Sequence, residues 1–450
     1  MCTSQLAFGF HPSRDIVATF DAARSSSDGG LLLVRAADER LGVSAALAAL
    51  MPDERDGRFV RHTRLEQIRQ RLYQICLGYE DCNDADALRI DPVLKTVCDL
   101  LPDTDDALSS QPTLSRFENA IDGRALNRMR DWFEQSYVDS LDPSTEVVVL
   151  DIDSTDDETH GSQQLSFFHG FYDQHMFHPL LVFDAQSGQL ASVLLRPGNA
   201  HAARGAGTVL ERLIRGIRRR LPRAQIVVRA DSGFCMPRIS ERLEKLDREI
   251  GDVDYIIGIA KNARLLKLAA TAMAEAKSIY AERKHTVRHF SSLAYAADTW
   301  PVIRHVVLKA EHSSYGENPR FVVTTLRSFD PQHIYDVGYC ARGQCENFIK
   351  DLKNALQADR LSCSSFKANA LRLLLYSAAY RLMHAVRQAA KDVGSQLGAM
   401  QLDTLRLRLL KVAATVTESA RRIVLRLPSA FPFAHAFAAI AAKLAPASSA

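Results

Sequence analysis

The sequence lacks several features that mark whole classes of protein. Its eight cysteines form no Cys-x2-Cys pair, and a chain of 450 residues without a secretory leader is not expected to carry a disulfide framework. The start, MCTSQLAFGFHPSRD, has neither the basic residues nor the long apolar run of a signal peptide. The most apolar later stretch, Ala370 to Val386, is interrupted by Arg372 and Arg381, so it should not span a membrane. We therefore expect a cytoplasmic protein.

The sequence also lacks a large net charge. Lys and Arg total 56 and Asp and Glu total 53, which leaves +3. Bulk charge therefore does not indicate a nucleic-acid partner. The charge is unevenly distributed, however, since the segment from Lys350 to Arg426 holds 14 basic and 5 acidic residues. Such an excess favours an anionic partner for this segment, although a solvated helical surface gives the same pattern.

The first part of the chain, residues 1–140, is predicted to be a mostly helical domain. The segments Ala37 to Leu50 and Thr63 to Leu77 place apolar residues three and four apart, which is the spacing of one helix face. A further helix is expected from Arg124 to Tyr137. The run that begins at Leu141, Leu-Asp-Pro-Ser-Thr, breaks the helical pattern and marks a domain boundary.

Beyond this boundary the pattern changes to short β-rich runs. Strands are expected at 147–153, 166–173, 179–184, 190–195, 226–231 and 253–260, with helices at 205–221 and after Pro237. This order predicts a mixed α/β sheet over residues 141–260. Residues 261–335 are predicted to form a β-rich insertion, and residues 336–390 to return to helix. In the C-terminal region, 391–450, the runs TLRLRLLKV and RRIVLRLP alternate and are expected as strands.

Two of the predicted strands end in aspartate. Asp153 ends an apolar strand, and Asp151 shares its face because side chains repeat every two residues. Asp231 ends the strand IVVRAD, and Gly233 permits a sharp turn after it. A carboxylate leaving a buried strand is costly unless it is paired or bound to metal, and the strand ends of an α/β sheet commonly form its functional edge. Taken singly, each aspartate also fits an ordinary turn or helix cap.

A polar stripe follows one side of the helix predicted from Tyr339. Tyr339, Arg342, Glu346, Lys350 and Lys353 fall within about a quarter of the helix circumference, and an apolar stripe lies beside them. These side chains suit a site that holds phosphate and metal. A solvated stripe with ion pairs one turn apart is the alternative for this helix alone. Together with the two aspartates, Glu346 supplies the hard oxygen ligands that Mg²⁺ or Mn²⁺ prefers.

These motifs resemble those of the DDE transposases of bacterial insertion sequences. The signature Tyr-x2-Arg-x3-Glu-x6-Lys of that group is matched by Tyr339, Arg342, Glu346 and Lys353 at every spacing. The segments DIDSTDD and RADSGF resemble the group's first and second aspartate strands. The resemblance implies an RNase H-like mixed-sheet core, an inserted β-rich subdomain before the glutamate helix and a helical N-terminal domain for DNA ends.

The resemblance also implies a mechanism and partners. Asp153, Asp231 and Glu346 would hold two Mg²⁺ (or Mn²⁺) ions for strand cleavage at the element ends and strand transfer into target DNA. Arg342 and Lys353 would contact phosphates, and Tyr339 the backbone near the cut. Trp300 is the candidate for stacking a flipped base, or else a packed residue of the insertion. The partners implied are the terminal inverted repeats, target DNA and a second copy of the chain in a homodimer.

Two other readings remain open at this point. The run VVVLDIDST also fits a haloacid-dehalogenase-type phosphatase, with Asp151 as nucleophile and Asp153 as acid. That reading leaves the Tyr339 helix unexplained. A non-catalytic DNA-binding protein would use basic surfaces, such as the arginines of 205–221, but needs no acidic triad.

Overall fold

The computed structural model describes residues 5–445, which form two compact units. One unit combines residues up to Ala120 with those from Ala378 onward, and the other comprises Ile121–Ser377. The expected regions 1–140 and 391–450 extend at their outer ends beyond the described residues. None of the helices within 5–445 has both the length and the apolar character that crossing a bilayer requires.

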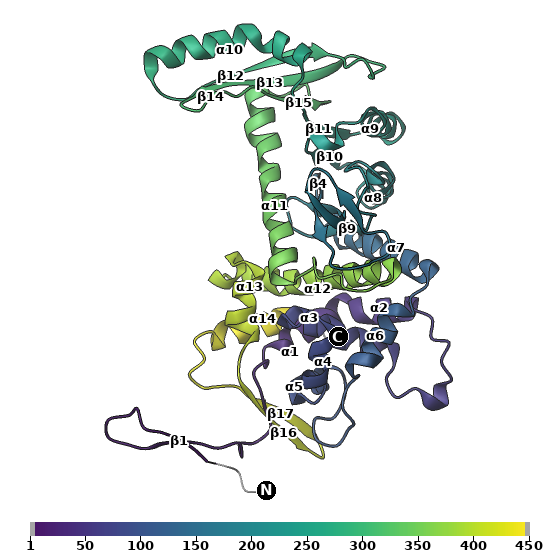
Figure 1. Cartoon of the computed structure of the whole chain (residues 1–450), viewed down its shortest axis with the longest axis vertical. Coiled ribbons are helices and arrows are strands. Elements are labelled where there is room, and N and C mark those ends of the chain that lie inside the picture. The colour runs from purple at the N-terminus through teal and green to yellow at the C-terminus, as the bar shows by residue number, and fades with distance from the viewer. Residues whose placement is uncertain (1–4, 446–450) are drawn as a thin grey trace. The chain divides into compact units, whose positions relative to one another are not determined.

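A mixed sheet forms the centre of the Ile121–Ser377 unit (Figure 1). Its predicted part contains β4 (Val147–Ser154), β8 (Leu180–Asp184), β9 (Leu190–Leu194), β10 (Gln225–Ala230) and β11 (Val253–Ile259). The strand order is β9-β8-β4-β10-β11, in which β8 runs antiparallel to β4, and β10 runs parallel to both β4 and β11. The predicted mixed α/β sheet is confirmed.

The segment expected as a β-rich insertion is continuous with this sheet. It contains α10 (Ala263–Arg283), β12 (Val287–Tyr295), β13 (Arg304–Ser313), β14 (Gly316–Glu317) and β15 (Arg320–Thr324). β15 pairs antiparallel with β11 and β13 pairs with β15, so these strands extend the core sheet and do not form a sheet of their own. The local pattern predicted the strands, but pairing between distant strands leaves no local signal.

The two faces of the sheet are covered by different helices. On one face α7 (Gly123–Ser140), α8 (Ala206–Arg220) and α9 (Pro237–Ile250) join α10 in the main hydrophobic core. On the other face Val227, Ile256 and Val322 pack against Ile334 and Tyr335 of the next helical segment. This segment is a π-helix over His333–Tyr339, a 3₁₀ turn over Cys340–Arg342, α11 (Gly343–Lys350) and a second π-helix over Asp351–Ala355. Tyr339 and Arg342, which were predicted for the functional site, belong to this segment.

A small three-stranded sheet follows β4. It contains β5 (Asp157–Glu158), β6 (Phe167–His169) and β7 (Gln174–Phe177), in the order β5-β7-β6. The strand expected over 166–173 is therefore shorter, because the chain turns after His169 and returns as β7.

The other unit is mainly helical. Its elements are β1 (Leu6–Phe8), β2 (Ile16–Ala18), β3 (Ser25–Ser26), α1 (Leu31–Leu41), α2 (Val43–Leu50), α3 (Arg64–Leu77), α4 (Ala85–Leu88), α5 (Pro92–Val97), α6 (Gln111–Asn119), α13 (Leu402–Leu405), β16 (Ala414–Ser419), β17 (Arg422–Arg426) and α14 (Ala434–Leu444). The long helix α12 (Phe366–Asp392) contributes its residues from Ala378 onward. The helix predicted from Ala37 to Leu50 is divided at Gly42, whose φ of 66° ends α1 in the left-handed region.

The two parts of this unit that are distant in sequence are joined by backbone hydrogen bonds. Gly29 N donates to Val412 O at 2.7 Å, Gly30 N donates to Leu410 O at 3.1 Å, and β16 pairs with β3. A Cβ atom on Gly30 would lie 2.1 Å from Leu409 O, so only glycine permits this approach.

One predicted strand of the C-terminal region is wrong. The run TLRLRLLKV forms α13 and a π-helix over Arg406–Leu410. Leu405, Leu407 and Leu409 alternate in sequence, but Leu405 and Leu409, four residues apart, are buried together with Leu410, whereas Leu407 is exposed. The other run, RRIVLRLP, contains β17 as predicted.

Candidate active site

Asp153 and Asp231 lie at neighbouring strand ends. β4 and β10 are adjacent and parallel, with Ile152 opposite Ala230, so the next residues leave the sheet at the same edge. The Asp153 carboxylate accepts a hydrogen bond from Arg342 Nη1 at 2.8 Å and one from the Ser154 amide at 2.9 Å. The Asp231 side chain accepts from the Gly233 amide at 2.9 Å, as the cap of a short turn. The turn predicted at Gly233 is present.

The environment of Asp153 disfavours a bare negative charge. Burial raises the pKa of Asp153 to about 6; the Arg342 guanidinium opposes this shift, and the negative charge of Asp231 adds to it. A pKa raised by both burial and a neighbouring carboxylate is typical of functional sites. A divalent cation between the two carboxylates would offset both the cost of burying the Asp153 charge and its repulsion by Asp231.

Asp151 lies on the same face of β4 but has a structural partner. Its two carboxylate oxygens accept hydrogen bonds from Arg229 Nε and Nη2 at 2.7 and 2.8 Å, and its side chain is fully buried. The parallel register places Arg229 directly opposite Asp151, and Arg229 Nη1 also donates to Gly338 O. Asp151 is therefore closed off from any substrate, which argues against its role as a phosphatase nucleophile.

Arg229 was not identified from the sequence. Its signal was present, because RAD at the end of β10 repeats the two-residue spacing of DID at the end of β4. Residues in register on neighbouring parallel strands point to the same face of the sheet. Asp151 and Arg229, each two residues before the final aspartate, therefore lie side by side.

The stripe on the Tyr339 helix reaches the aspartate edge at three points. Arg342 pairs with Asp153, and Lys353 Nζ donates to Asp156 O at 2.9 Å and pairs with its carboxylate at 3.2 Å. Burial raises the pKa of the Tyr339 phenol, with Arg342 opposing the shift and Asp231 adding to it. A Cβ atom on Gly258 of β11 would lie 2.5 Å from the Tyr339 hydroxyl and 3.1 Å from Ser232 N, so a glycine leaves room for this phenol.

Glu346 is the predicted site residue that the structure leaves apart from the aspartates. Its side chain is exposed. Within residues 5–445, no three His, Cys, Asp or Glu side chains stand together as a ready metal site. Glu346 nevertheless lies four residues after Arg342 in continuous helix, which places it one turn further along the stripe between Arg342 and Lys353.

Trp300 lies in a different cluster. Its ring packs edge-on against Tyr295 at 5.4 Å and beneath the Arg304 guanidinium at 5.0 Å, beside the main core. The arginines of α8 are largely engaged within the protein. Arg212 pairs with Glu134, Arg215 with Glu211 and Glu249, and Arg218 donates to backbone carbonyls such as Gly251 O.

A set of exposed aromatic rings lies beside the aspartates and was not predicted as functional. In the hairpin of β6 and β7, the exposed fractions are 40% for Phe167, 53% for Phe168 and 85% for Phe171. The adjoining Tyr172 ring contacts Phe171 at 5.0 Å. The pKa of Tyr172 is raised by burial and then by the charges of Asp156, Asp153 and Asp231, which places this ring close to the carboxylates.

Asp157 is a buried carboxyl group whose ionisation opposes folding. Both of its oxygens are buried and lack hydrogen-bond partners among residues 5–445. Burial raises its pKa well above the usual range, and Asp359 adds to this shift while Lys353 opposes it. Because the folded pKa is raised, the stability linked to this proton is present at acid pH and is lost as the pH rises above about 4.

We expect Asp157→Asn to stabilise the protein at pH 8. The gain should be about 1–3 kcal/mol, and it should shrink as the pH is lowered towards 5, because asparagine carries no such proton. Thermal unfolding at a series of pH values measures the effect. The matched variant Asp156→Asn should lower the melting temperature, since Lys353 stabilises the Asp156 carboxylate and lowers its pKa. Equal responses of the two variants would contradict this assignment.

Comparison with known proteins identifies the chain. The family described as Transposase DDE domain group 1 matches residues 8–449, nearly the whole chain. The protein is therefore a DDE transposase, an enzyme of the polynucleotidyl transferase class. It belongs to the Transposase DDE domain group 1 family.

Two further comparisons add little to this identification. No curated protein sequence matches the chain. Among solved structures, a piggyBac transposase in a synaptic complex with hairpin DNA, determined by cryo-EM, is similar with a TM-score of 0.47 and 11% identity, covering 86% of this chain and 80% of that one.

DDE transposases generally use divalent metal ions. Asp153 and Asp231 fit such an ion, because both offer carboxylate oxygens at one sheet edge and the negative charge of Asp231 raises the pKa of Asp153. Glu346 is not part of this pair.

Proposed function

We propose that this transposase cleaves DNA strands at the ends of an insertion sequence and joins them to target DNA, with Asp153, Asp231 and Glu346 as its acidic triad. The observation that carries the proposal is the emergence of Asp153 and Asp231 side by side, across from a helix that presents Arg342 to Asp153. The order of three antiparallel strands followed by two parallel ones supports an RNase H-like core. Two double-stranded DNA ends must be brought together, so we propose a homodimer as the active form.

The residues at this sheet edge would have different roles in the reaction. Bound Mg²⁺ or Mn²⁺ would supply Lewis-acid activation of the attacking hydroxyl and stabilise the leaving 3′ oxygen. Asp153 and Asp231 would hold these ions, with Glu346 as the third ligand from the next helical turn. Arg342 has a planar guanidinium that can bind phosphate in two parallel hydrogen bonds once its contact with Asp153 is released. Tyr339 would contact the DNA backbone beside Asp231.

Lys353 has a more local task in this structure. It binds Thr155 and Asp156, in the loop that directly follows Asp153. We propose that Lys353 holds this loop in position. In this role it acts on the DNA phosphate indirectly, through the loop, and does not bind the phosphate itself.

Cleavage of labelled DNA tests the proposed function. The substrate is a duplex that carries the terminal inverted repeat and its flanking sequence, taken from the DNA on either side of the gene. Strand cleavage is expected with Mg²⁺ or Mn²⁺ and not with EDTA. Cleavage that persists in EDTA would reject the metal assignment, and binding without any cleavage would favour a non-catalytic DNA-binding protein.

We propose the hairpin rings, in place of Trp300, as the surface that stacks unpaired bases. Phe168 and Phe171 are exposed in the hairpin that carries Tyr172, whereas the Trp300 ring contacts Tyr295 and Arg304. Base stacking on an aromatic ring contributes about 1–3 kcal/mol per base.

The double variant Phe168→Ala, Phe171→Ala should therefore bind a duplex with an unpaired tail about 10-fold more weakly and leave affinity for a fully paired duplex unchanged. Fluorescence anisotropy with both probes measures this. Tyr315→Ala removes an even more exposed ring from the turn between β13 and β14 and should have no effect. A loss shared by both probes, or by the Tyr315 variant, would contradict the stacking role.

A further inference from the structure

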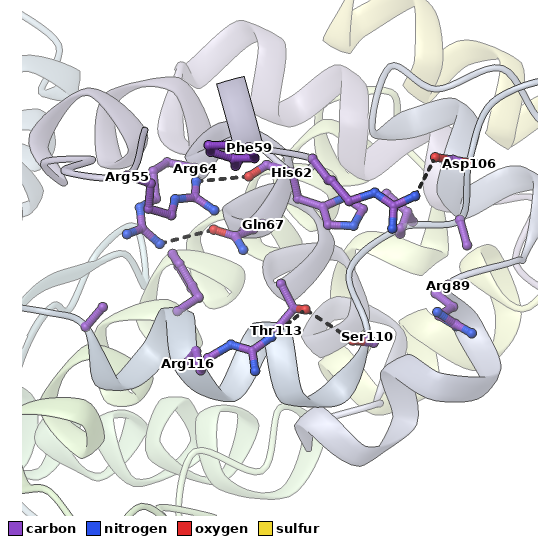
Figure 2. Close-up of a pocket in the computed structure, with 15 residues that line it drawn as sticks. Arg55, Phe59, His62, Arg64, Gln67, Arg89, Asp106, Ser110, Thr113 and Arg116 are labelled. Atoms are coloured by element: carbon purple, nitrogen blue, oxygen red, sulfur yellow. Dashed lines mark hydrogen bonds and ion pairs between the residues drawn. The ribbon is translucent and has the colours of Figure 1, made fainter. Parts of the chain in front are cut away.

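A basic cavity lies in the helical unit. Its volume is about 630 Å³. Figure 2 shows Arg64 and Gln67 of α3 facing Thr113 and Arg116 of α6 across it. The lining residues are Arg55, Phe59, Arg61, His62, Arg64, Gln67, Arg89, Asp106, Ala107, Leu108, Ser110, Thr113, Arg116, Phe117 and Ala120.

The lining carries a large excess of positive charge. It includes five arginines and a single carboxylate, that of Asp106. Asp106 pairs with Arg61 at 3.2 Å, and both side chains are largely exposed to solvent. Asp53, just outside the lining, pairs with Arg55 at 2.6 Å and reaches Arg64 at 3.7 Å. After these pairs are counted, the cavity still has an unbalanced charge.

Two of the arginines have no acidic partner. Arg89 and Arg116 form no ion pair within the described part of the chain, and Arg116 donates only a long 3.4 Å hydrogen bond to Thr113. These two arginines come from different segments, one after α4 and one on α6. Like-charged side chains that surround one hollow repel each other, so a bound anion would stabilise the arrangement.

The side chain of Arg64, in the wall of the cavity, is held in place by packing and hydrogen bonding. Its side chain is 12% exposed, its guanidinium lies over the Phe117 ring at 5.7 Å, and one nitrogen donates to Gln67. Its Nε is buried and has no hydrogen-bond partner in residues 5–445. A buried donor without a partner is costly, and a bound acceptor would remove that cost.

The volume and the spread of the donors favour a polymer over a single small anion. One phosphate could reach only two or three of the side chains, whereas the five arginines and the Ser110 and Thr113 hydroxyls surround the hollow. Arginine forks match phosphate oxygens, and several phosphates at regular spacing occur along a DNA strand. We propose that this cavity binds backbone phosphates of DNA. The inference rests on the proposed function only in taking DNA as the substrate.

Binding in EDTA separates this proposal from catalysis. The double variant Arg89→Ala, Arg116→Ala should bind a fluorescein-labelled duplex of random sequence about 10-fold more weakly. In a NaCl series, the slope of log K against log salt should fall by about 2, because each lost phosphate contact removes about 0.9. The double variant Arg89→Lys, Arg116→Lys keeps the charges and should keep the slope.

Matched controls make each outcome decisive. Arg421→Ala, Arg422→Ala removes the same charge from an exposed site around β17 and should leave affinity and slope near wild type. Equal losses in both double variants, or wild-type DNA binding by the cavity variant, would overturn the proposal. If inorganic pyrophosphate raises the melting temperature of wild type alone while DNA affinity is unchanged, the cavity is a small-anion site. Binding is measured in EDTA and cleavage separately in Mg²⁺, so a failure of cleavage and a failure of the cavity can be told apart.

Discussion

Replacing Asp153 or Asp231 with asparagine should reduce strand cleavage by about 1,000-fold or more while DNA affinity stays unchanged. Each change removes a carboxylate charge where cations must bind, and a loss of about 4 kcal/mol of transition-state stabilisation gives this factor. Glu346→Gln should have an effect of the same order if the third ligand comes from the next helical turn. Cleavage assays at saturating DNA, with Mg²⁺ titrated, measure both the rate and the metal requirement.

The control and the readout follow from the geometry. Glu241→Gln changes an exposed carboxylate on α9, which covers the opposite face of the sheet, and should cleave at the wild-type rate. Partial rescue of an asparagine variant at high Mn²⁺ would support loss of metal binding. A Glu346→Gln enzyme that cleaves normally would remove Glu346 from the triad and leave only the two aspartates.

The second large effect concerns the buried pair of Arg229 and Asp151. We expect Arg229→Met to lower the free energy of unfolding by about 3–5 kcal/mol, because the fully buried Asp151 carboxylate loses its bidentate partner. Burial already raises the pKa of Asp151 against the effect of Arg229. Without Arg229 that pKa rises further, so the deficit should be largest at alkaline pH and shrink as the pH falls.

A double-mutant cycle in urea separates this pair from a general effect of losing an arginine. Arg229→Met combined with Asp151→Leu should recover much of the lost stability, because neither charge is then left buried alone. Arg215→Met removes an arginine whose carboxylate partners are partly exposed and should cost less than about 1 kcal/mol. If Arg229→Met costs no more than Arg215→Met, Asp151 is not held as the structure indicates.

The sheet edge that carries Asp153 and Asp231 could be predicted because its residues carry a local signal. A short apolar run that ends in aspartate identifies a strand and its exit, and this held at both Asp153 and Asp231. The face that Arg342 and Lys353 share followed from helical spacing and survives the π-helical turn between them. That irregularity begins after Glu346 and changes the angle between turns there, so the spacing alone could not fix how Glu346 lies relative to Lys353.

What could not be predicted depends on contacts between distant segments. To predict that β15 pairs with β11, one must know which strand of the sheet has a free edge. The sequence of neither strand specifies that edge. Leu405, Leu407 and Leu409 fit a strand and a helix equally well over so short a run, and tertiary packing decided for helix. Trp300 illustrates a third case, because a single aromatic residue carries no information on whether a neighbouring guanidinium will cover it.

The hydrogen bonds from Gly29 to Val412 and from Gly30 to Leu410 have a consequence for synthesis of the protein. A ribosome releases the first hundred residues long before their partners at the far end of the chain exist. The Ile121–Ser377 unit is contiguous and can fold while translation continues, whereas the helical unit must wait for the last strands. A product that terminates shortly after Ser377 therefore retains the aspartates but lacks a finished basic cavity, and so would be made without the means we assign it to hold DNA.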